Sequence, residues 1–156
     1  MMSIIYTDGA CREPLKVKDG MFASWAFVLI KRENSGEHIK GEVITWRSGY
    51  VEESQAAETF IGAERATNQT AELSGVYWAG WYLRKMKILK ATIFTDSRYA
   101  MNIVSGQYGA KANLKLVTRT RRLFFDTKYR IKWIRGHVGH RFNEMADSLA
   151  KDQLRD

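Results

Sequence analysis

The sequence predicts an α/β domain in which a mixed β-sheet carries helices packed on its faces. Three strand-like runs lie close together near the start of the chain, at residues 3–8, 21–31 and 38–47, and the turn-prone ENSGE separates the last two. After residue 68, helical and strand-like runs alternate, an order that requires crossover connections. With 156 residues, of which 45% are apolar, the chain has the size of a single domain, residues 1–156, with its own hydrophobic core.

The individual elements follow from local patterns. The first three runs are rich in β-branched and aromatic residues and predict an antiparallel meander. The segment AELSGVYWAGWYLRKMK has apolar residues at steps of three and four and predicts an amphipathic helix, with Asn68 as its cap. The remaining patterns predict a strand at 91–95, a short helix at 97–105, a basic helix at 114–125, a strand at 129–134 and a terminal helix at 141–154.

The positive charge is concentrated in one part of the chain. There are 25 Lys and Arg residues against 17 Asp and Glu residues, a formal net charge of +8. The stretch from Lys111 to Arg135 holds nine basic residues and one acidic residue, so it carries this whole excess. A local positive surface commonly binds a polyanion, and nucleic acid is the first candidate. The alternative is a basic helix face that only aids solubility.

Cysteine usage and hydropathy favour a cytoplasmic location. The single cysteine, Cys11, excludes an internal disulfide and a cysteine-based zinc site, as is typical of a reducing compartment. The start of the chain, MMSIIYTDGA, lacks the basic and apolar regions of a signal peptide, and no window is apolar for long enough to span a membrane. We therefore expect a cytoplasmic protein that has no membrane partner.

Two segments far apart in the sequence repeat one pattern. IIYTDGA at 4–10 and TIFTDSR at 92–98 both place an aspartate, Asp8 or Asp96, after an apolar strand-like run. Ligands gather outside the carboxyl ends of parallel strands, so these carboxylates face each other if the two strands are neighbours. Asp-Gly and Asp-Ser are also common in turns and at helix starts, which is the alternative interpretation of each aspartate.

Two more carboxylates are candidates for the same site. Glu72 falls in the first turn of the helix that follows Asn68, and Asp147 lies beside the apolar stripe of the terminal helix. Asn143 precedes Asp147 by one helical turn and shares its face. Alternatively, Glu72 is a first-turn acid favoured by the helix dipole, and Asp147 is an ordinary residue at the border of the apolar stripe.

Four convergent carboxylates need compensation of their charge. Two carboxylates about 4 Å apart repel by roughly 4 kcal/mol at an effective dielectric constant of about 20. Protons or cations must therefore accompany such a cluster, and two Mg²⁺ ions balance four negative charges with the oxygen ligands that they prefer. A pair of metal ions can stabilise both the attacking and the leaving oxygen at a phosphodiester. The basic stretch then supplies the attraction for the nucleic acid.

One histidine is a candidate for proton transfer. His137 lies in a glycine-flanked loop before the terminal helix, and a histidine near a metal-activated water can move protons around neutral pH. The alternative is a loop histidine that forms ordinary hydrogen bonds. His137 and His140 have only His38 as a further imidazole in the chain, so a zinc site is disfavoured.

Four motifs together resemble the type 1 ribonuclease H family. In chain order they are YTDGA at 6–10, NQTAEL at 68–73, TDSRYA at 95–100 and WIRGHVGHRFNEMADSLA at 133–150. The resemblance covers nearly the whole chain and implies the ribonuclease H-like fold, with a five-stranded mixed sheet in the strand order 3-2-1-4-5. It also implies an endonuclease that cleaves the RNA strand of an RNA–DNA hybrid with two Mg²⁺ or Mn²⁺ ions and leaves 3′-hydroxyl and 5′-phosphate ends. We expect it to be a monomer.

The resemblance also assigns roles to residues by their motif positions. The residues that match the metal ligands are Asp8, Glu72, Asp96 and Asp147. Asp8 is expected to bridge both ions, and His137 matches a mobile histidine that assists proton transfer or product release. The residues at positions where the family contacts the substrate are Gly9, Cys11, Thr67, Asn68, Gln69, Arg98 and Asn143. Contacts to a 2′-hydroxyl let such a site distinguish RNA from DNA.

Three segments depart from the family pattern. From Asp96 to Trp133 is 37 residues, which is short for a member with a basic protrusion. The cations expected to replace that protrusion are Lys115, Arg119, Arg121 and Arg122. The segment between Tyr50 and Glu72 is longer than usual and carries four acids and one arginine, so we expect a packed excursion or a partner surface. The segment ACREPLK keeps one proline, Pro14, of the loop that usually follows the first aspartate.

Two other functions stay open on the sequence alone. One is another nuclease of the same fold, such as a junction resolvase or a transposase-like enzyme, although the His137 loop and the NQTAEL motif argue against it. The other is a hybrid-binding module whose nuclease site has decayed, although retention of all four acids argues against that.

Overall fold

The computed structural model describes residues 3–12, 23–33, 40–136 and 140–155, which form a five-stranded sheet and four helices. The strands are β1 (Ser3–Cys11), β2 (Ala23–Glu33), β3 (Lys40–Tyr50), β4 (Lys90–Thr95) and β5 (Lys128–Trp133). The helices are α1 (Asn68–Lys85), α2 (Arg98–Val104), α3 (Leu114–Phe124) and α4 (Arg141–Gln153). The predicted turn between the second and third strands lies mostly outside the described residues.

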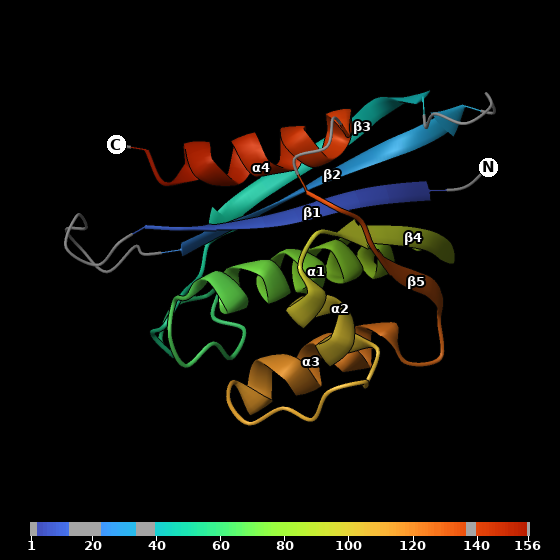
Figure 1. Ribbon diagram of the computed structural model, residues 1–156. Helices are drawn as coiled ribbons and strands as arrows, with labels where there is room; N and C mark the ends of the chain where they lie inside the picture. Colours follow the sequence, from blue (N-terminus) through green and yellow to red (C-terminus); the bar gives the residue numbers. More distant parts are fainter. Residues whose placement is uncertain (1–2, 13–22, 34–39, 137–139, 156) are drawn as a thin grey trace.

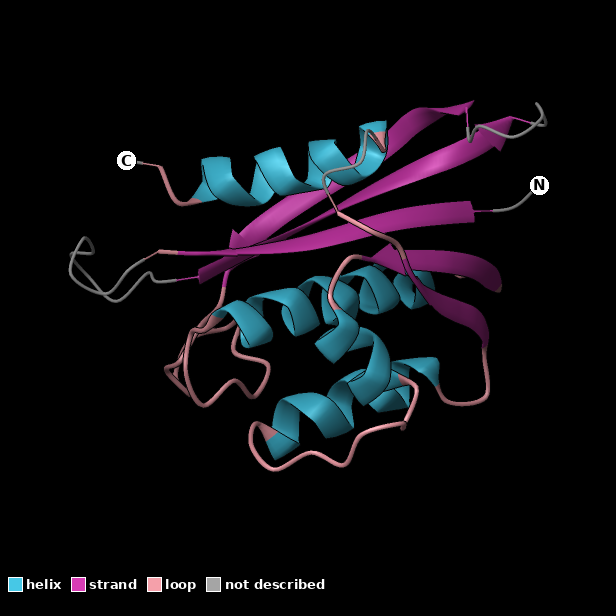
Figure 2. Cartoon of the chain, viewed as in Figure 1, coloured by secondary structure: helices cyan, strands magenta, loops and turns pink. Residues whose placement is uncertain are grey.

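The strand order is β3-β2-β1-β4-β5, as the resemblance implied. Strand β2 pairs antiparallel with β1 and with β3, whereas β4 pairs parallel with β1 and with β5. Helix α4 covers one face of the sheet over β1, β2 and β3, and α1 covers the other face (Figures 1 and 2). Helices α2 and α3 lie beyond α1 on that second side. The predicted meander followed by crossovers is confirmed.

Strand β1 lies at the centre of the sheet and is buried on both faces. Ile5 faces α1 in the larger core cluster, whereas Ile4 and Tyr6 pack with Phe142 of α4 in a second cluster. Burial on both faces explains why the run is apolar at nearly every position instead of alternating. The strand also extends beyond the predicted end at residue 8, because its antiparallel pairing with β2 continues to Cys11.

Helix α1 differs from the predicted amphipathic helix in two respects. Its N-cap is Thr67 and not Asn68, because the Thr67 hydroxyl accepts from the Thr70 backbone N–H while the Thr70 hydroxyl accepts from the Thr67 N–H. The helix is also buried on more than one side, since it packs on the sheet and contacts α3. Apolar residues therefore occur around most of its circumference.

Two glycines let α1 approach β1 closely. A Cβ atom at Gly9 would lie 2.5 Å from the backbone nitrogen of Glu72, and one at Gly75 would lie 3.1 Å from the backbone oxygen of Asp8. A side chain at Gly9 would therefore force the helix and the strand apart. Because the strand and the helix are in close contact here, the side chains of Asp8 and Glu72 lie near each other.

The acidic segment between β3 and α1 is packed against the rest of the fold. Val51, Ile61 and Ala63 are buried. The Glu64 backbone N–H donates to the side-chain oxygen of Asn113 at 2.8 Å, just before α3. The segment between β3 and α1 therefore packs against the start of α3, in agreement with the expected packed excursion. Among the described residues, none of the helices has the length and apolar character that a bilayer crossing requires.

Candidate active site

Three carboxylates converge where the parallel part of the sheet ends. Asp8, Glu72 and Asp96 each offer an oxygen that lies within 4.8 Å of the other two. The parallel pairing of β1 with β4 ends at Thr7 and Thr95, and each aspartate is the next residue along its strand direction. Glu72 comes from the second turn of α1, five residues after the N-cap, so the predicted position in the first turn is wrong.

Asp147 lines the same cavity but is not part of the triad. The cavity has a volume of about 480 Å³, and its lining also includes Asn68, Ser97, Gly136 and Lys151. One Asp147 carboxylate oxygen accepts from the Lys151 ammonium group at 2.9 Å, one helical turn further along α4. The structure thus brings all four predicted acids to one cavity, with the fourth held by a lysine.

Burial and mutual repulsion raise the pKa values of this cluster. Asp8 is only 3% exposed, and its burial, followed by the charge of Asp96, raises its pKa from 3.8 to about 7. Burial raises the pKa of Glu72 well above its usual range, and the charges of Asp8 and Asp96 add to the effect. The cluster therefore retains protons at a pH where isolated carboxyl groups are fully ionised.

The donor set fits a divalent cation that prefers oxygen. Glu72 carries a buried side-chain oxygen, Oε2, that has no hydrogen-bond partner among the described residues. Such an atom is costly unless a proton or a cation compensates it. Three carboxylates with no sulfur or imidazole ligand among the described residues of the cluster match the preference of Mg²⁺ or Mn²⁺ and not that of zinc.

The end of β5 holds Asp96 from the other side. The Trp133 indole N–H donates to the Asp96 backbone oxygen at 3.0 Å. A Cβ atom at Gly136 would lie 2.8 Å from an Asp96 carboxylate oxygen, so a larger residue there would displace the Asp96 side chain. The guanidinium of Arg98 stacks on the Trp133 ring at 4.1 Å from its centroid. Arg98 is exposed, and this stacking holds its guanidinium at the end of β5.

The other residues predicted to contact the substrate differ in their exposure. Thr67, Asn68 and Gln69 are exposed at the start of α1, and Cys11 is exposed at the end of β1. Asn143 is only 2% exposed, and its side-chain oxygen has no hydrogen-bond partner among the described residues, so it does not lie at the surface. His137 and Pro14 lie outside the described residues.

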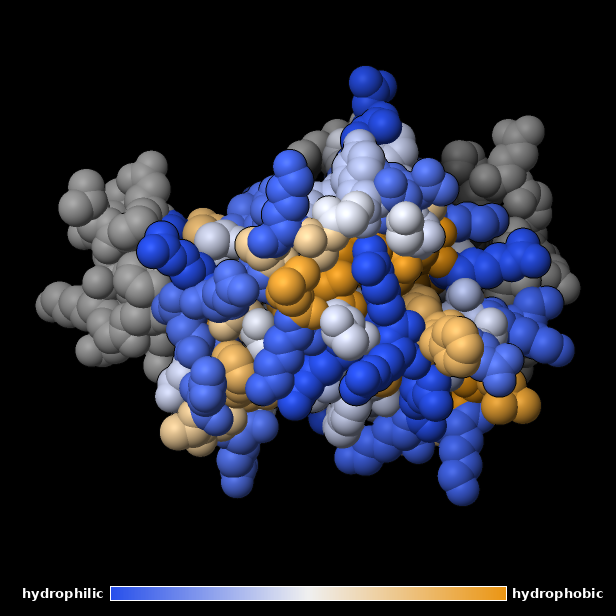
Figure 3. Space-filling view, turned by 90° about the horizontal axis from the view of Figure 1, so that it is seen from below, coloured by the Kyte–Doolittle hydropathy of each residue, from blue (hydrophilic) through white to orange (hydrophobic). Residues whose placement is uncertain are grey.

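The basic helix α3 is less available than its sequence suggests. Arg121 donates to the backbone oxygens of Ile103 at 2.8 Å and Tyr108 at 2.9 Å, and Arg119 donates to that of Phe60 at 3.4 Å. Lys115 and Arg122 are exposed. Figure 3 shows the molecule from below, where α3 lies, and apolar side chains occupy the centre of this face with hydrophilic ones around them. Arg121 thus connects elements of the fold.

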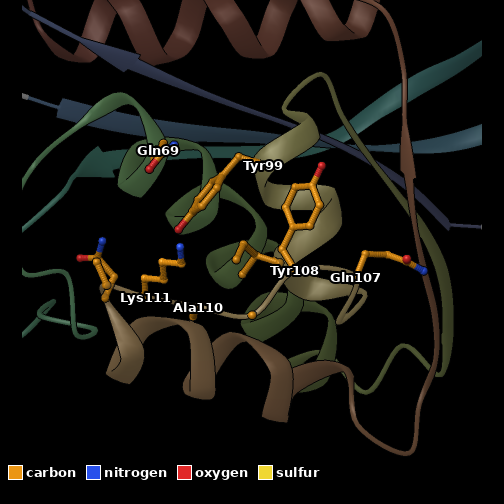
Figure 4. A pocket seen from close by; sticks show the side chains of 10 residues that line it. Gln69, Tyr99, Gln107, Tyr108, Ala110 and Lys111 are labelled. Atoms are coloured by element: carbon orange, nitrogen blue, oxygen red, sulfur yellow. The ribbon is translucent and has the colours of Figure 1, made fainter.

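A second cavity, of about 470 Å³, lies between α1, α2 and the loop before α3 (Figure 4). Gln69 of α1, Tyr99 of α2 and Lys111 of the loop are among the residues that line it. Asn68 lines the carboxylate cavity and Gln69 lines this one, so both cavities border the start of α1.

Lys151 is a site residue that the sequence interpretation missed. Its ammonium group has a raised pKa because it donates a hydrogen bond to Asp147 and is attracted by its charge. The available signal was the spacing of four residues between Asp147 and Lys151, which places opposite charges on one helix face.

A family model decides the assignment, because the RNase H model matches residues 2–155. The chain belongs to the RNase H family. Similar proteins include a ribonuclease H of Chromobacterium violaceum, 28% identical with coverage of 94% of this chain and 90% of that protein. Another is ribonuclease HI of Campylobacter jejuni, 24% identical with coverage of 95% and 88%. The prediction of a nuclease of the ribonuclease H class is confirmed.

Solved structures of RNase H domains share the fold. The N-terminal RNase H domain of Rv2228c from Mycobacterium tuberculosis superimposes with a TM-score of 0.71, at 22% identity, over 97% of this chain and 92% of that one. RNase H1 from Halobacterium salinarum gives a TM-score of 0.70, at 20% identity, over 99% and 98%. The predicted ribonuclease H-like fold is confirmed.

Proposed function

We propose that this chain is an endonuclease that hydrolyses the RNA strand of RNA–DNA hybrids at its carboxylate cluster, leaving 3′-hydroxyl and 5′-phosphate ends. The observation that carries the proposal is the convergence of Asp8, Glu72 and Asp96 within 4.8 Å in a chain of the RNase H family. The relatives named ribonuclease H, in three bacterial genera, support the same substrate class.

The acids would hold two divalent cations, Mg²⁺ or Mn²⁺. Asp8, Glu72 and Asp96 would provide oxygen ligands within 4.8 Å of one another, and Asp147 would provide one from the lining of the same cavity. When bound, the ions supply charge stabilisation for the attacking and leaving oxygens of the phosphodiester. The buried carboxyl groups must give up their protons to act as ligands, and Asp147 must share its oxygens between Lys151 and the cation.

The remaining groups would position the substrate and move protons. Exposed Thr67, Asn68 and Gln69 stand at the start of α1 between the two cavities, where a nucleic acid can contact both. Hydrogen bonds from such side chains to 2′-hydroxyls favour RNA in the strand that is cut. His137 follows Gly136, a lining residue of the cavity, in the sequence and stays a candidate for proton transfer.

A strand-specific cleavage assay tests the proposal. Hybrids labelled on either the RNA or the DNA strand, duplex DNA and a four-way junction are incubated with the protein in Mg²⁺, with and without EDTA. We expect cleavage of the RNA strand alone, and none in EDTA. Cleavage of the junction would favour the resolvase alternative, and hybrid binding without cleavage at any Mg²⁺ or Mn²⁺ concentration would favour a decayed site.

A further inference from the structure

Strand β5 presents a row of cations on the open face of the sheet edge. Side chains alternate along the strand: Tyr129, Ile131 and Trp133 are half-buried. The Tyr129 ring contacts Phe124 of α3, which places these three on the face with α1 and α3. The alternate residues, Lys128, Arg130 and Lys132, are exposed on the opposite face.

This opposite face is the one that α4 covers elsewhere. Helix α4 packs on β1, β2 and β3, and Figure 1 shows it over that part of the sheet, away from β5. The cations of β5 are therefore exposed on a sheet surface that none of the helices in the described part of the chain covers. Lys90 of β4 joins them, because it is exposed and in register with Lys128.

The arrangement is unfavourable for the free protein. Like charges on neighbouring strands in register repel, as Lys90 and Lys128 do. Among the described residues, no carboxylate forms an ion pair with Lys90, Lys128, Arg130 or Lys132. A cluster of this kind lowers the free energy of unfolding unless an anion is bound, so it points to an anionic ligand.

The row begins at the carboxylate cavity. Lys132 precedes Trp133, whose indole donates to Asp96, and Gly136 contacts the Asp96 carboxylate. From Lys132 to Lys128 the strand runs about 13 Å away from the site, at roughly 3.3 Å per residue. That length corresponds to about four base-pair steps along the axis of a duplex, at roughly 3.4 Å per step.

We propose that Lys90, Lys128, Arg130 and Lys132, the β5 track, bind the phosphate backbone of the hybrid on one side of the cleaved bond. The proposal rests on the proposed function and names where the flanking duplex is held. It also differs from the expectation for α3, since Arg119 and Arg121 are engaged inside the fold whereas the β5 track is free of such contacts among the described residues. The partner is a sugar–phosphate backbone, because evenly spaced exposed cations neutralise evenly spaced phosphates.

The test compares two double variants in an Asp96→Asn background, in which we expect RNA to stay uncut. Arg130→Gln with Lys132→Gln removes two charges from the β5 track. Arg47→Gln with Arg155→Gln removes two exposed charges on β3, at the opposite edge of the sheet, and after α4, and is the matched control. Fluorescence anisotropy measures the affinity for hybrids of about 6 and about 18 base pairs over a range of salt concentrations, since the longer hybrid reaches along the track.

We expect the track variant to bind the long hybrid about tenfold more weakly and with a salt slope smaller by between about one and two, with little change for the short hybrid. The control should stay close to the parent protein. If the track variant has an unchanged affinity for the long hybrid and an unchanged salt slope, the proposal is overturned. That result would favour an acidic protein as the partner of this surface. An equal loss in the control would also overturn it. Failure of RNA cleavage by the unmodified protein would reject the proposed function without affecting this binding measurement.

Discussion

Asp8 is a carboxyl group on the central strand of the sheet, where apolar residues usually lie. The contact between Gly9 and α1 keeps it buried, and its backbone neighbours supply one compensating hydrogen bond, from the Gly9 N–H at 2.8 Å. Burial next to Asp96 raises its pKa to about 7. The residue is therefore unfavourable for the fold unless a proton or a cation accompanies it.

Asp8→Asn should stabilise the metal-free protein at alkaline pH. Because the pKa of Asp8 is raised in the folded state, that state binds more protons than the unfolded state between about pH 4 and pH 7, and stability falls as the pH rises through this window. The asparagine variant lacks this loss, so we expect it to be more stable by roughly 1–3 kcal/mol at about pH 8 and much closer to the unmodified protein at about pH 4. Urea unfolding in EDTA measures both values. A less stable variant at the higher pH would contradict the interpretation.

Lys151 should compete with the cations for Asp147. The two side chains are joined at 2.9 Å, and the lysine adds positive charge to the edge of the cavity. We expect Lys151→Met to lower the Mg²⁺ concentration for half-maximal cleavage by about threefold, since like charges repel and Asp147 is released. Lys151→Arg keeps the charge and should behave like the unmodified protein. A higher Mg²⁺ requirement in the methionine variant would show that Lys151 assists the cations instead.

The sequence allowed the acids to be predicted but not every partner. Asp8 and Asp96 follow matching strand-like runs, so local pattern was sufficient to place them side by side. Lys151 was missed because a pair of opposite charges four residues apart is also ordinary on a helix surface. The prediction of Asp147 placed this face of α4 at the site, but a lysine one turn further along is also common on a solvated face.

At the scale of elements, α3 combines two roles that the sequence could not separate. Arg121 reaches the end of α2 and the loop after it, whereas Arg122, the next residue, is exposed. Both belong to the same basic stretch, and the position of the loop after α2 decides which arginine donates hydrogen bonds to backbone oxygens. Its course depends on contacts between distant segments, including the segment at 51–66 that packs on α3.

Arg121→Gln and Arg122→Gln should therefore differ in their effect on the free energy of unfolding. We expect the first to lower the free energy of unfolding by about 1–3 kcal/mol, because two backbone oxygens lose a charged donor. The second should change stability by less than about 0.5 kcal/mol, since it alters a surface residue. Thermal and urea unfolding measure both. Equal stability of the two variants would show that the Arg121 contacts contribute nothing to the fold.

The order and type of the elements were predictable, whereas their details were not. Strand and helix periodicity indicated all nine described elements, but the N-cap of α1 shifted from Asn68 to Thr67 and β1 extended past Asp8. Both differences arise from neighbours in space: Thr70 completes a reciprocal cap with Thr67, and β2 continues to pair with β1 beyond the parallel ladder.

At the scale of the whole molecule, opposite charges occupy separate surfaces. The acids gather in one cavity, and the cations lie on β5, on α3 and around the second cavity. This separation lets a polyanion bind although the cavity itself is acidic, provided that cations bridge the acids and the phosphate. Expectations of a monomer, a single domain and a cytoplasmic location stay predictions.

The central claim is that the carboxylate cluster holds divalent cations. Calorimetric titration of Mg²⁺ and Mn²⁺ near pH 7, in two buffers of different ionisation enthalpy, measures both cation binding and the protons released. The account predicts binding with release of protons from Asp8 and Glu72, whose pKa values are raised, and an affinity at least about tenfold weaker in Asp8→Asn. Absence of binding to the unmodified protein, or equal affinity in the variant, would contradict it.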